Sequence, residues 1–157
     1  LGDFPDVVVS LEITFPFRPP GLIDDMITRL AETGVDSILA VRPEYGSVWK
    51  NDDGTIRRVD SGDVPRKFKE KILIGLKGVA CITHPEFIRE GYLVGSNVGM
   101  YEVLDPYGPI EVRNDEDFAM ARLLYENRNV SDAGRVKSDA VRHEELRLHR
   151  DQRKESL

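Results

Sequence analysis

The chain has 157 residues, of which 40% are hydrophobic and 32% charged, and its formal net charge is -6 at pH 7. A single cysteine, Cys81, excludes an internal disulfide and a cysteine-rich zinc site. No apolar stretch approaches the roughly 18 residues that a membrane helix needs, and the acidic balance disfavours general binding to nucleic-acid phosphates. These features predict one cytoplasmic domain that is large enough to bury a core.

The front of the chain is expected to hold a strand followed by a stiff polar loop. Residues 7–9 are three valines in a row, and β-branched residues suit a strand that is covered on both faces. The next stretch, LEITFPFRPP at residues 11–20, carries Glu12, Thr14 and Arg18 together with three prolines. Polar side chains on a stiff bend between a strand and a helix are a common way to build a binding site.

An amphipathic helix is expected over residues 22–33, because its apolar residues recur at three- and four-residue spacing. Gly34 is the expected cap at the carboxyl end of this helix. Residues 35–43, VDSILAVRP, form the next expected strand. Strand, helix and strand together predict a β-α-β unit with parallel strands and a right-handed crossover.

The remaining elements also alternate between strands and helices. The turn residues NDDG at 51–54 predict a hairpin. We expect further strands around residues 72–83 and 98–103, a short helix capped from Thr83, and a short strand at residues 109–113. An acid-led helix is expected over residues 114–128. The class is therefore α/β, with a mostly parallel sheet and flanking helices.

The two ends of the chain differ in character from its middle. The chain begins with Leu1 and reaches a buried-type strand within a few residues, so we expect an N-terminal part to be missing. Residues 131–157 are highly charged with few aliphatic side chains. This pattern favours a solvated helix or a mobile tail over a partner-binding helix.

Three stretches, in this order, resemble motifs of the acylneuraminate cytidylyltransferases: DVVVSLEITFPFRP, IGLKGVACIT and IEVRNDEDFAMA. The first resembles a strand followed by QPTSPLR, with Glu12 in place of the glutamine and Thr14 and Arg18 matching. The second resembles NGAIYI, with Lys77 in place of the asparagine and Gly78 matching. The third resembles IDIDTPEDFELA, with Glu111 at the first aspartate.

The resemblance implies a Rossmann-like nucleotidyltransferase fold, of which residues 1–130 would form the C-terminal portion. It also implies an enzyme that transfers CMP from CTP to a sialic-acid-like nonulosonic acid and releases pyrophosphate, with Mg²⁺ as cofactor and a homodimer as the assembly. The nucleotide-binding loop of the family would precede Leu1, so this chain alone is expected to be inactive. The alternative is a non-catalytic relative that binds a sugar acid or a partner.

The same resemblance gives the candidate site residues. Arg18 is the expected catalytic residue and also a substrate contact, because its planar fork suits a carboxylate or a phosphate. The alternative for Arg18 is a salt bridge to Asp24 or Asp25. The other expected substrate contacts are Glu12, Thr14, Lys77 and Gly78, where the glycine would allow close approach to the backbone.

Glu111 is the expected ligand of Mg²⁺, which prefers oxygen donors. Arg113 stands where the family has its second aspartate, and a guanidinium cannot bind the metal. Glu111 would then act with another carboxylate, or metal binding would be altered.

A basic run follows the predicted hairpin and consists of Arg66, Lys67, Lys69 and Lys71. It is either a solvated loop or part of an interface between subunits. Tyr45 and Trp49 lie in the same region, where aromatic residues favour an interface or a sugar-stacking role.

Overall fold

The computed structural model describes residues 4–128. These residues fall into two units, one ending at Glu111 and the other beginning at Val112. The predicted charged tail, residues 131–157, lies outside the described residues. Within residues 4–128, no helix has both the length and the apolar character needed to cross a membrane.

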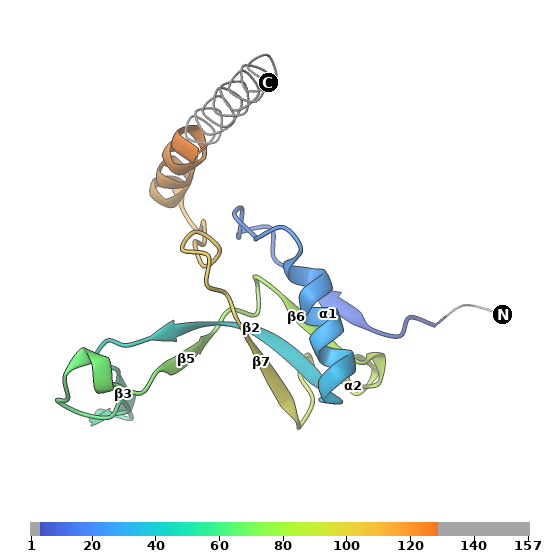
Figure 1. Ribbon diagram of the computed structural model, residues 1–157, viewed down its shortest axis with the longest axis horizontal. Coiled ribbons are helices and arrows are strands. Elements are labelled where there is room, and N and C mark those ends of the chain that lie inside the picture. The colour runs from blue at the N-terminus through green and yellow to red at the C-terminus, as the bar shows by residue number, and fades with distance from the viewer. Residues whose placement is uncertain (1–3, 129–157) are drawn as a thin grey trace, which may run out of the picture. The chain divides into compact units, whose positions relative to one another are not determined.

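The first unit is built on a five-stranded sheet in the order β1-β6-β2-β5, with β7 also paired to β2 (Figure 1). The strands are β1 (Val8–Ser10), β2 (Ser37–Glu44), β5 (Ile72–Gly75), β6 (Cys81–Thr83) and β7 (Val98–Glu102). Of the pairings in this sheet, β1–β6, β2–β6 and β2–β5 are antiparallel, and only β2–β7 is parallel.

The predicted α/β class is confirmed, whereas the prediction of a mostly parallel sheet is wrong for the described strands. The reason is that β6 lies between β1 and β2 and runs against both of them. β1 and β2 therefore point the same way, as the expected β-α-β unit requires, but they are not neighbours. Local sequence patterns identify strands without identifying which strand lies beside which.

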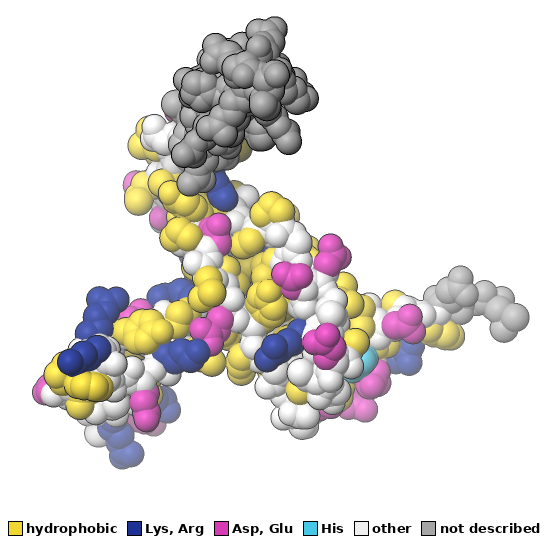
Figure 2. All heavy atoms as spheres, viewed as in Figure 1, with side chains coloured by type: hydrophobic (Ala, Val, Ile, Leu, Met, Phe, Trp, Pro, Cys, Tyr) yellow, Lys and Arg dark blue, Asp and Glu magenta, His cyan; other side chains and the backbone are white. Residues whose placement is uncertain are grey.

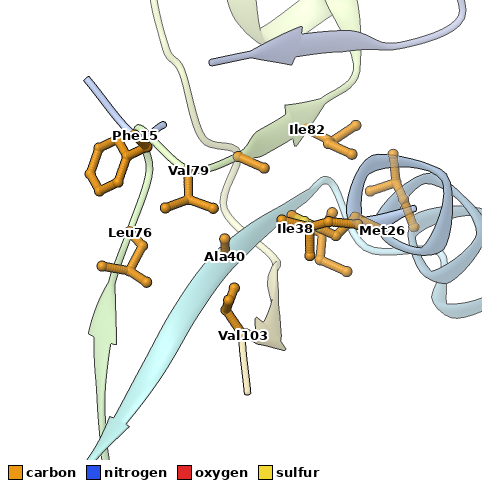
Figure 3. Packing of buried hydrophobic residues seen from close by; sticks show 11 residues of the cluster. Phe15, Met26, Ile38, Ala40, Leu76, Val79, Ile82 and Val103 are labelled. Atoms are coloured by element: carbon orange, nitrogen blue, oxygen red, sulfur yellow. The ribbon is translucent and has the colours of Figure 1, made fainter. Parts of the chain in front are cut away.

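The helix of this unit is α1 (Leu22–Thr33), which lies against one face of the sheet (Figure 1). Its buried residues Met26 and Leu30 belong to the same cluster as Ile38 of β2 and Ile82 of β6 (Figure 3). The predicted cap at Gly34 is confirmed, because its φ of 63° is left-handed and its N–H donates to the Leu30 carbonyl.

One insertion interrupts the sheet beside β2. Val41 of β2 pairs with Gly75, and Leu39 of β2 pairs with Cys81. One residue separates Val41 from Leu39, whereas five residues separate Gly75 from Cys81. Residues 76–80, named here the 76–80 loop, leave the ladder at this point. The Leu76 N–H donates to the Ala40 carbonyl at 2.7 Å, and the Ala40 N–H donates to the Ala80 carbonyl at 3.0 Å. The loop is thereby held at both ends although its middle has no strand partner.

The predicted hairpin is confirmed as β3 (Trp49–Asp52) and β4 (Thr55–Arg58), followed by a short 3-10 helix, η1 (Arg66–Phe68). Asp53 and Gly54 form its turn with φ values of 48° and 88°, the left-handed pair that a tight hairpin requires. Residues 45–71 are named here the arm. Figure 2 shows Lys and Arg side chains gathered around this part of the chain.

Two local expectations are wrong in the described residues. No strand forms at residues 109–113, which are irregular backbone. The short helix α2 (Pro85–Arg89) begins after His84 without a side-chain cap. The Thr83 hydroxyl is instead buried against the Ser37 hydroxyl at 2.6 Å, where it cannot serve the helix.

The acid-led helix is present at residues 115–128. The Asn114 side chain accepts from the Asp117 N–H at 2.8 Å, and the Asp117 carboxylate accepts from the Arg113 N–H at 3.0 Å. This reciprocal pair satisfies donors that the start of a helix leaves without partners.

Asp60 organises the arm. Its side chain is only 1% exposed and accepts hydrogen bonds from Arg58 Nε at 3.0 Å, the Val48 N–H at 2.8 Å and the Gly62 N–H at 2.9 Å. Lys69 Nζ lies 3.6 Å from the same carboxylate. The Arg58 guanidinium, helped by the two backbone donors, holds the pKa of Asp60 well below its ordinary value.

We expect Asp60→Asn to lower the thermal unfolding temperature, because an amide nitrogen would face donors that now meet a carboxylate. Since folding depresses the pKa of Asp60, its stabilising effect is complete above the ordinary carboxyl pKa of about 4 and declines as the pH falls below it. The difference in unfolding temperature between wild type and D60N should therefore decrease as the pH falls from about 5 to 2. Thermal unfolding followed by circular dichroism measures it.

Asp63→Asn is the matched control, because Asp63 also pairs with Arg58 but its side chain is 93% exposed. It should shift the unfolding temperature much less. A D60N deficit that keeps its full size at pH 2, or a deficit no larger than that of D63N, would contradict this role for Asp60.

Candidate functional site

Two loops meet at one edge of the sheet. β1, β2 and β7 run in the same direction, so residues 11–20 after β1 and residues 103–110 after β7 leave the sheet at its carboxyl edge. The rings of Phe17 and Tyr107 lie 6.2 Å apart, which brings the two loops into contact. Ligands of α/β sheets bind at this edge. Residues 11–20 are named here the front loop.

Arg18 joins the front loop to the 76–80 loop. Its Nε donates to the Val79 carbonyl at 2.6 Å, and its Nη2 donates to the Gly78 carbonyl at 3.2 Å and to the Glu12 carbonyl at 2.9 Å. The alternative salt bridge to Asp24 or Asp25 does not form in the part of the chain that the structure describes. The sequence predicts that this guanidinium binds an anion, whereas in the structure it donates hydrogen bonds to backbone carbonyls.

Glu12 and Gly78 are in direct contact. The Glu12 N–H donates to the Gly78 carbonyl at 2.8 Å. A Cβ added at Gly78 would lie 2.4 Å from Phe15 Cε2 and 2.7 Å from Glu12 Cδ, closer than real side chains approach. Gly78 was expected to admit a ligand to the backbone, and here the same space is taken by Phe15 and the Glu12 carboxyl group.

Phe15 is a residue whose role the sequence pattern did not reveal. It stands where the resembled motif has a serine, yet it is only 6% exposed and belongs to the core with Leu76 and Val79 (Figure 3). An aromatic residue directly before Pro16, within a polar loop, is the signal that could have identified it as an anchor. Phe15 fixes the front loop to the 76–80 loop by packing, while Arg18 does so by hydrogen bonds.

Three polar side chains of the front loop and the 76–80 loop lack hydrogen-bond or ion-pair partners within residues 4–128. The Thr14 hydroxyl is buried and has no hydrogen-bond partner among the described residues. Lys77 is exposed, as is Glu12, and neither side chain forms an ion pair with any residue between 4 and 128. The cluster therefore combines a cation, an anion and a buried hydroxyl on a fixed backbone. We name Glu12, Thr14, Lys77 and Gly78 the lip residues.

The predicted metal ligand lies in a different setting from the one expected. Glu111 is half-buried on irregular backbone, not at the end of a strand, and both Glu111 and Arg113 make further interactions within the chain. Within residues 4–128, no three His, Cys, Asp or Glu side chains gather in a metal-binding arrangement. Mg²⁺ commonly takes only one or two carboxylates together with substrate phosphates, so a single glutamate is chemically compatible with it.

The arm offers exposed aromatic residues and few uncommitted cations. Trp49 is 57% exposed with the Arg58 guanidinium 5.5 Å above its ring, and Phe68 is 66% exposed. Of the predicted basic run, Lys69 is paired with Asp60 and Lys71 with Glu102. Lys69 of the basic run therefore stabilises the arm through its pairing with Asp60.

Comparison with known proteins gives a likeness in structure alone. No family model matches the chain, and no curated protein does. A solved structure, the 4-diphosphocytidyl-2C-methyl-D-erythritol synthase of Anaerococcus prevotii, matches with a TM-score of 0.58 and 14% sequence identity over 80% of this chain. The chain spans 61% of that enzyme's length. This likeness shows a mixed α/β fold consistent with the Rossmann-like architecture that the motifs implied.

We expect Gly78→Ala to destabilise the protein by about 1–3 kcal/mol, because the added methyl must displace either the buried Phe15 ring or the 76–80 loop. Urea unfolding measures this difference. Gly75→Ala is the matched control, since a Cβ there would meet only the tip of the Leu39 side chain, at 3.2 Å. Equal stability of G78A and G75A would show that the close packing at Gly78 is not a constraint.

Proposed function

We propose that this chain belongs to a cytidylyltransferase that transfers CMP from CTP to a sialic-acid-like nonulosonic acid and releases pyrophosphate. The observation that carries the proposal is the gathering of the lip residues at the carboxyl edge of the sheet. These residues come from two motifs about 60 positions apart, and both motifs resemble those of the acylneuraminate cytidylyltransferases. The fold likeness to a synthase of a diphosphocytidyl compound supports a nucleotidyltransferase in general.

The lip residues suit a polyhydroxylated acid. The Lys77 ammonium would attract the sugar carboxylate, and the Glu12 carboxylate would accept hydrogen bonds from sugar hydroxyls. The buried Thr14 hydroxyl would gain the partner that it lacks within residues 4–128. An unsatisfied buried hydroxyl costs about 1–3 kcal/mol, which a ligand contact would offset.

The anomeric hydroxyl oxygen of the acid forms a bond to the α-phosphorus of CTP and gives up its proton to solvent. The bond between the α-phosphorus and the oxygen that bridges to the β-phosphate breaks, and pyrophosphate leaves with that oxygen and the bonding electrons. Such a transfer requires mainly alignment and stabilisation of negative charge on the phosphates. Glu111 would hold Mg²⁺, which when bound neutralises phosphate charge. Lys77 and Thr14 would orient the acid so that its anomeric oxygen faces the nucleotide.

A homodimer is part of this proposal. The arm carries Trp49 and Phe68, both largely exposed, and exposed aromatic residues are enriched at protein interfaces.

The second candidate is a non-catalytic relative that binds a sugar acid without turnover. Arg113 favours it, because a guanidinium stands where the resembled motif has its second metal-binding aspartate. Binding of the acid without release of pyrophosphate would distinguish this candidate from the enzyme.

The proposal is tested on the full-length protein by thermal-shift titration with CTP, UTP, GTP, ATP and N-acetylneuraminic acid, together with a pyrophosphate-release assay in Mg²⁺. We expect stabilisation by the sugar acid and, among the nucleotides, preferentially by CTP. Stabilisation by the acid alone supports the second candidate. If neither CTP nor any nonulosonic acid raised the unfolding temperature, the proposed function would be wrong.

Thr14→Val separates binding from stability. We expect T14V to fold with equal or greater stability, because it removes a buried hydroxyl without a partner, while affinity for the sugar acid falls roughly 5- to 30-fold. Calorimetric titration and thermal unfolding measure the two effects. Thr28→Val is the control, since Thr28 donates to the Asp24 carbonyl on α1. Unchanged affinity in T14V would remove Thr14 from the site.

A further inference from the structure

We infer that Arg18 is a positioning residue: it fixes the front loop to the 76–80 loop and thereby sets the positions of Glu12 on the first loop and Lys77 on the second. This inference rests on the proposed function for the ligand, and it changes the role of Arg18 within the site. The sequence suggested that the guanidinium itself binds an anion. Its contacts point to the backbone instead.

The need for such a residue arises from the insertion beside β2. The middle of the 76–80 loop leaves the ladder, so the Gly78 and Val79 carbonyls have no partner on β2. Buried or half-buried carbonyls without donors are costly, and most are paired in native structures. Arg18 supplies donors to two of these carbonyls, at Gly78 and Val79, from a position about 60 residues earlier in the chain.

The geometry requires an arginine rather than any cation. The Nε and Nη2 atoms of one plane reach Val79 on the 76–80 loop and Glu12 on the front loop at 2.6 and 2.9 Å. A lysine ammonium is a compact point charge without this fixed fork, so it cannot reproduce the arrangement. Nη1 has no hydrogen-bond partner among residues 4–128 and would be the one nitrogen left for a ligand.

Two of the lip residues, Glu12 and Gly78, accept hydrogen bonds from Arg18 directly. Glu12 accepts from Arg18 through its carbonyl, donates through its N–H to Gly78, and packs its carboxyl group against Gly78. Lys77 precedes Gly78 in the chain. The spacing between the Glu12 carboxylate and the Lys77 ammonium therefore depends on the backbone that Arg18 holds. A sugar acid would bind across that spacing, with its carboxylate at Lys77 and its hydroxyls at Glu12.

A double-mutant cycle tests the inference. Arg18→Lys is made in the wild type and in a Glu12→Gln, Lys77→Met background, and the Kd for N-acetylneuraminic acid is measured by calorimetric titration. We expect R18K to raise the Kd roughly tenfold in the wild type and to have little further effect in the double background, because residues that act through each other are non-additive. A direct contact between Arg18 and the ligand predicts the full tenfold effect in both backgrounds and would overturn the inference.

Amide hydrogen exchange provides the second readout and does not depend on the ligand. The Glu12 N–H bonds the Gly78 carbonyl, so we expect its exchange to accelerate at least tenfold in R18K at temperatures well below unfolding. Arg29→Lys, an exposed arginine on α1, is the control and should leave this amide unchanged.

The two readouts separate the possible failures. If the wild type binds no sugar acid but R18K accelerates hydrogen exchange at the Glu12 amide, the proposed function is wrong while the positioning of Glu12 by Arg18 stands. If R18K lowers the unfolding temperature yet leaves the Kd unchanged, Arg18 is merely structural and the inference is wrong. An unchanged Glu12 amide in R18K would also contradict it.

Discussion

The candidate site depends on the hydrogen bonds between the Arg18 guanidinium and the backbone carbonyls of Glu12, Gly78 and Val79. These bonds close a gap that the sheet itself creates, because five residues of the strand beside β2 leave the ladder. The middle of this loop has no partner on β2, and its carbonyls accept instead from the front loop, through the Glu12 N–H and the Arg18 guanidinium. The core residue Phe15 packs at the same junction, so apolar burial and polar satisfaction fix the same two loops.

This junction explains why glycine is needed at residue 78. Phe15 and the Glu12 carboxyl group occupy the space that a side chain would fill. The lip residues consequently stand on a backbone with little room to adjust, and preorganisation of this kind lowers the cost of ordering a site when a ligand binds. In the arm, by contrast, Arg58 and Lys69 are both paired with Asp60. Lys77 differs from them in being exposed and without an ion pair among the described residues.

The sequence predicted those parts of the fold whose causes are local. The apolar spacing of α1, the left-handed glycine at its end, the Asp53–Gly54 turn and the acid-led helix at 115–128 all depend on residues a few positions apart. The order and direction of the strands depend on pairing across the chain, and the expectation of a mostly parallel sheet was wrong for the described strands. The strand expected at residues 109–113 has a suitable composition but pairs with no strand in the described residues. For the site, the motifs gave Glu12 and Gly78 as contacts of the same substrate, and the structure brings these two residues into contact with each other. The motifs gave no sign that Arg18 would bind carbonyls, because backbone acceptors carry no side-chain signature.

The most direct test of this account is the exchange rate of the Arg18 Nε–H with water, measured by nuclear magnetic resonance on protein labelled at arginine. The account predicts a sharp resonance that exchanges far more slowly than those of exposed arginines, because the proton is held in a 2.6 Å hydrogen bond to the Val79 carbonyl. An exchange rate equal to that of an exposed arginine such as Arg29 would contradict the claim that Arg18 joins the two loops.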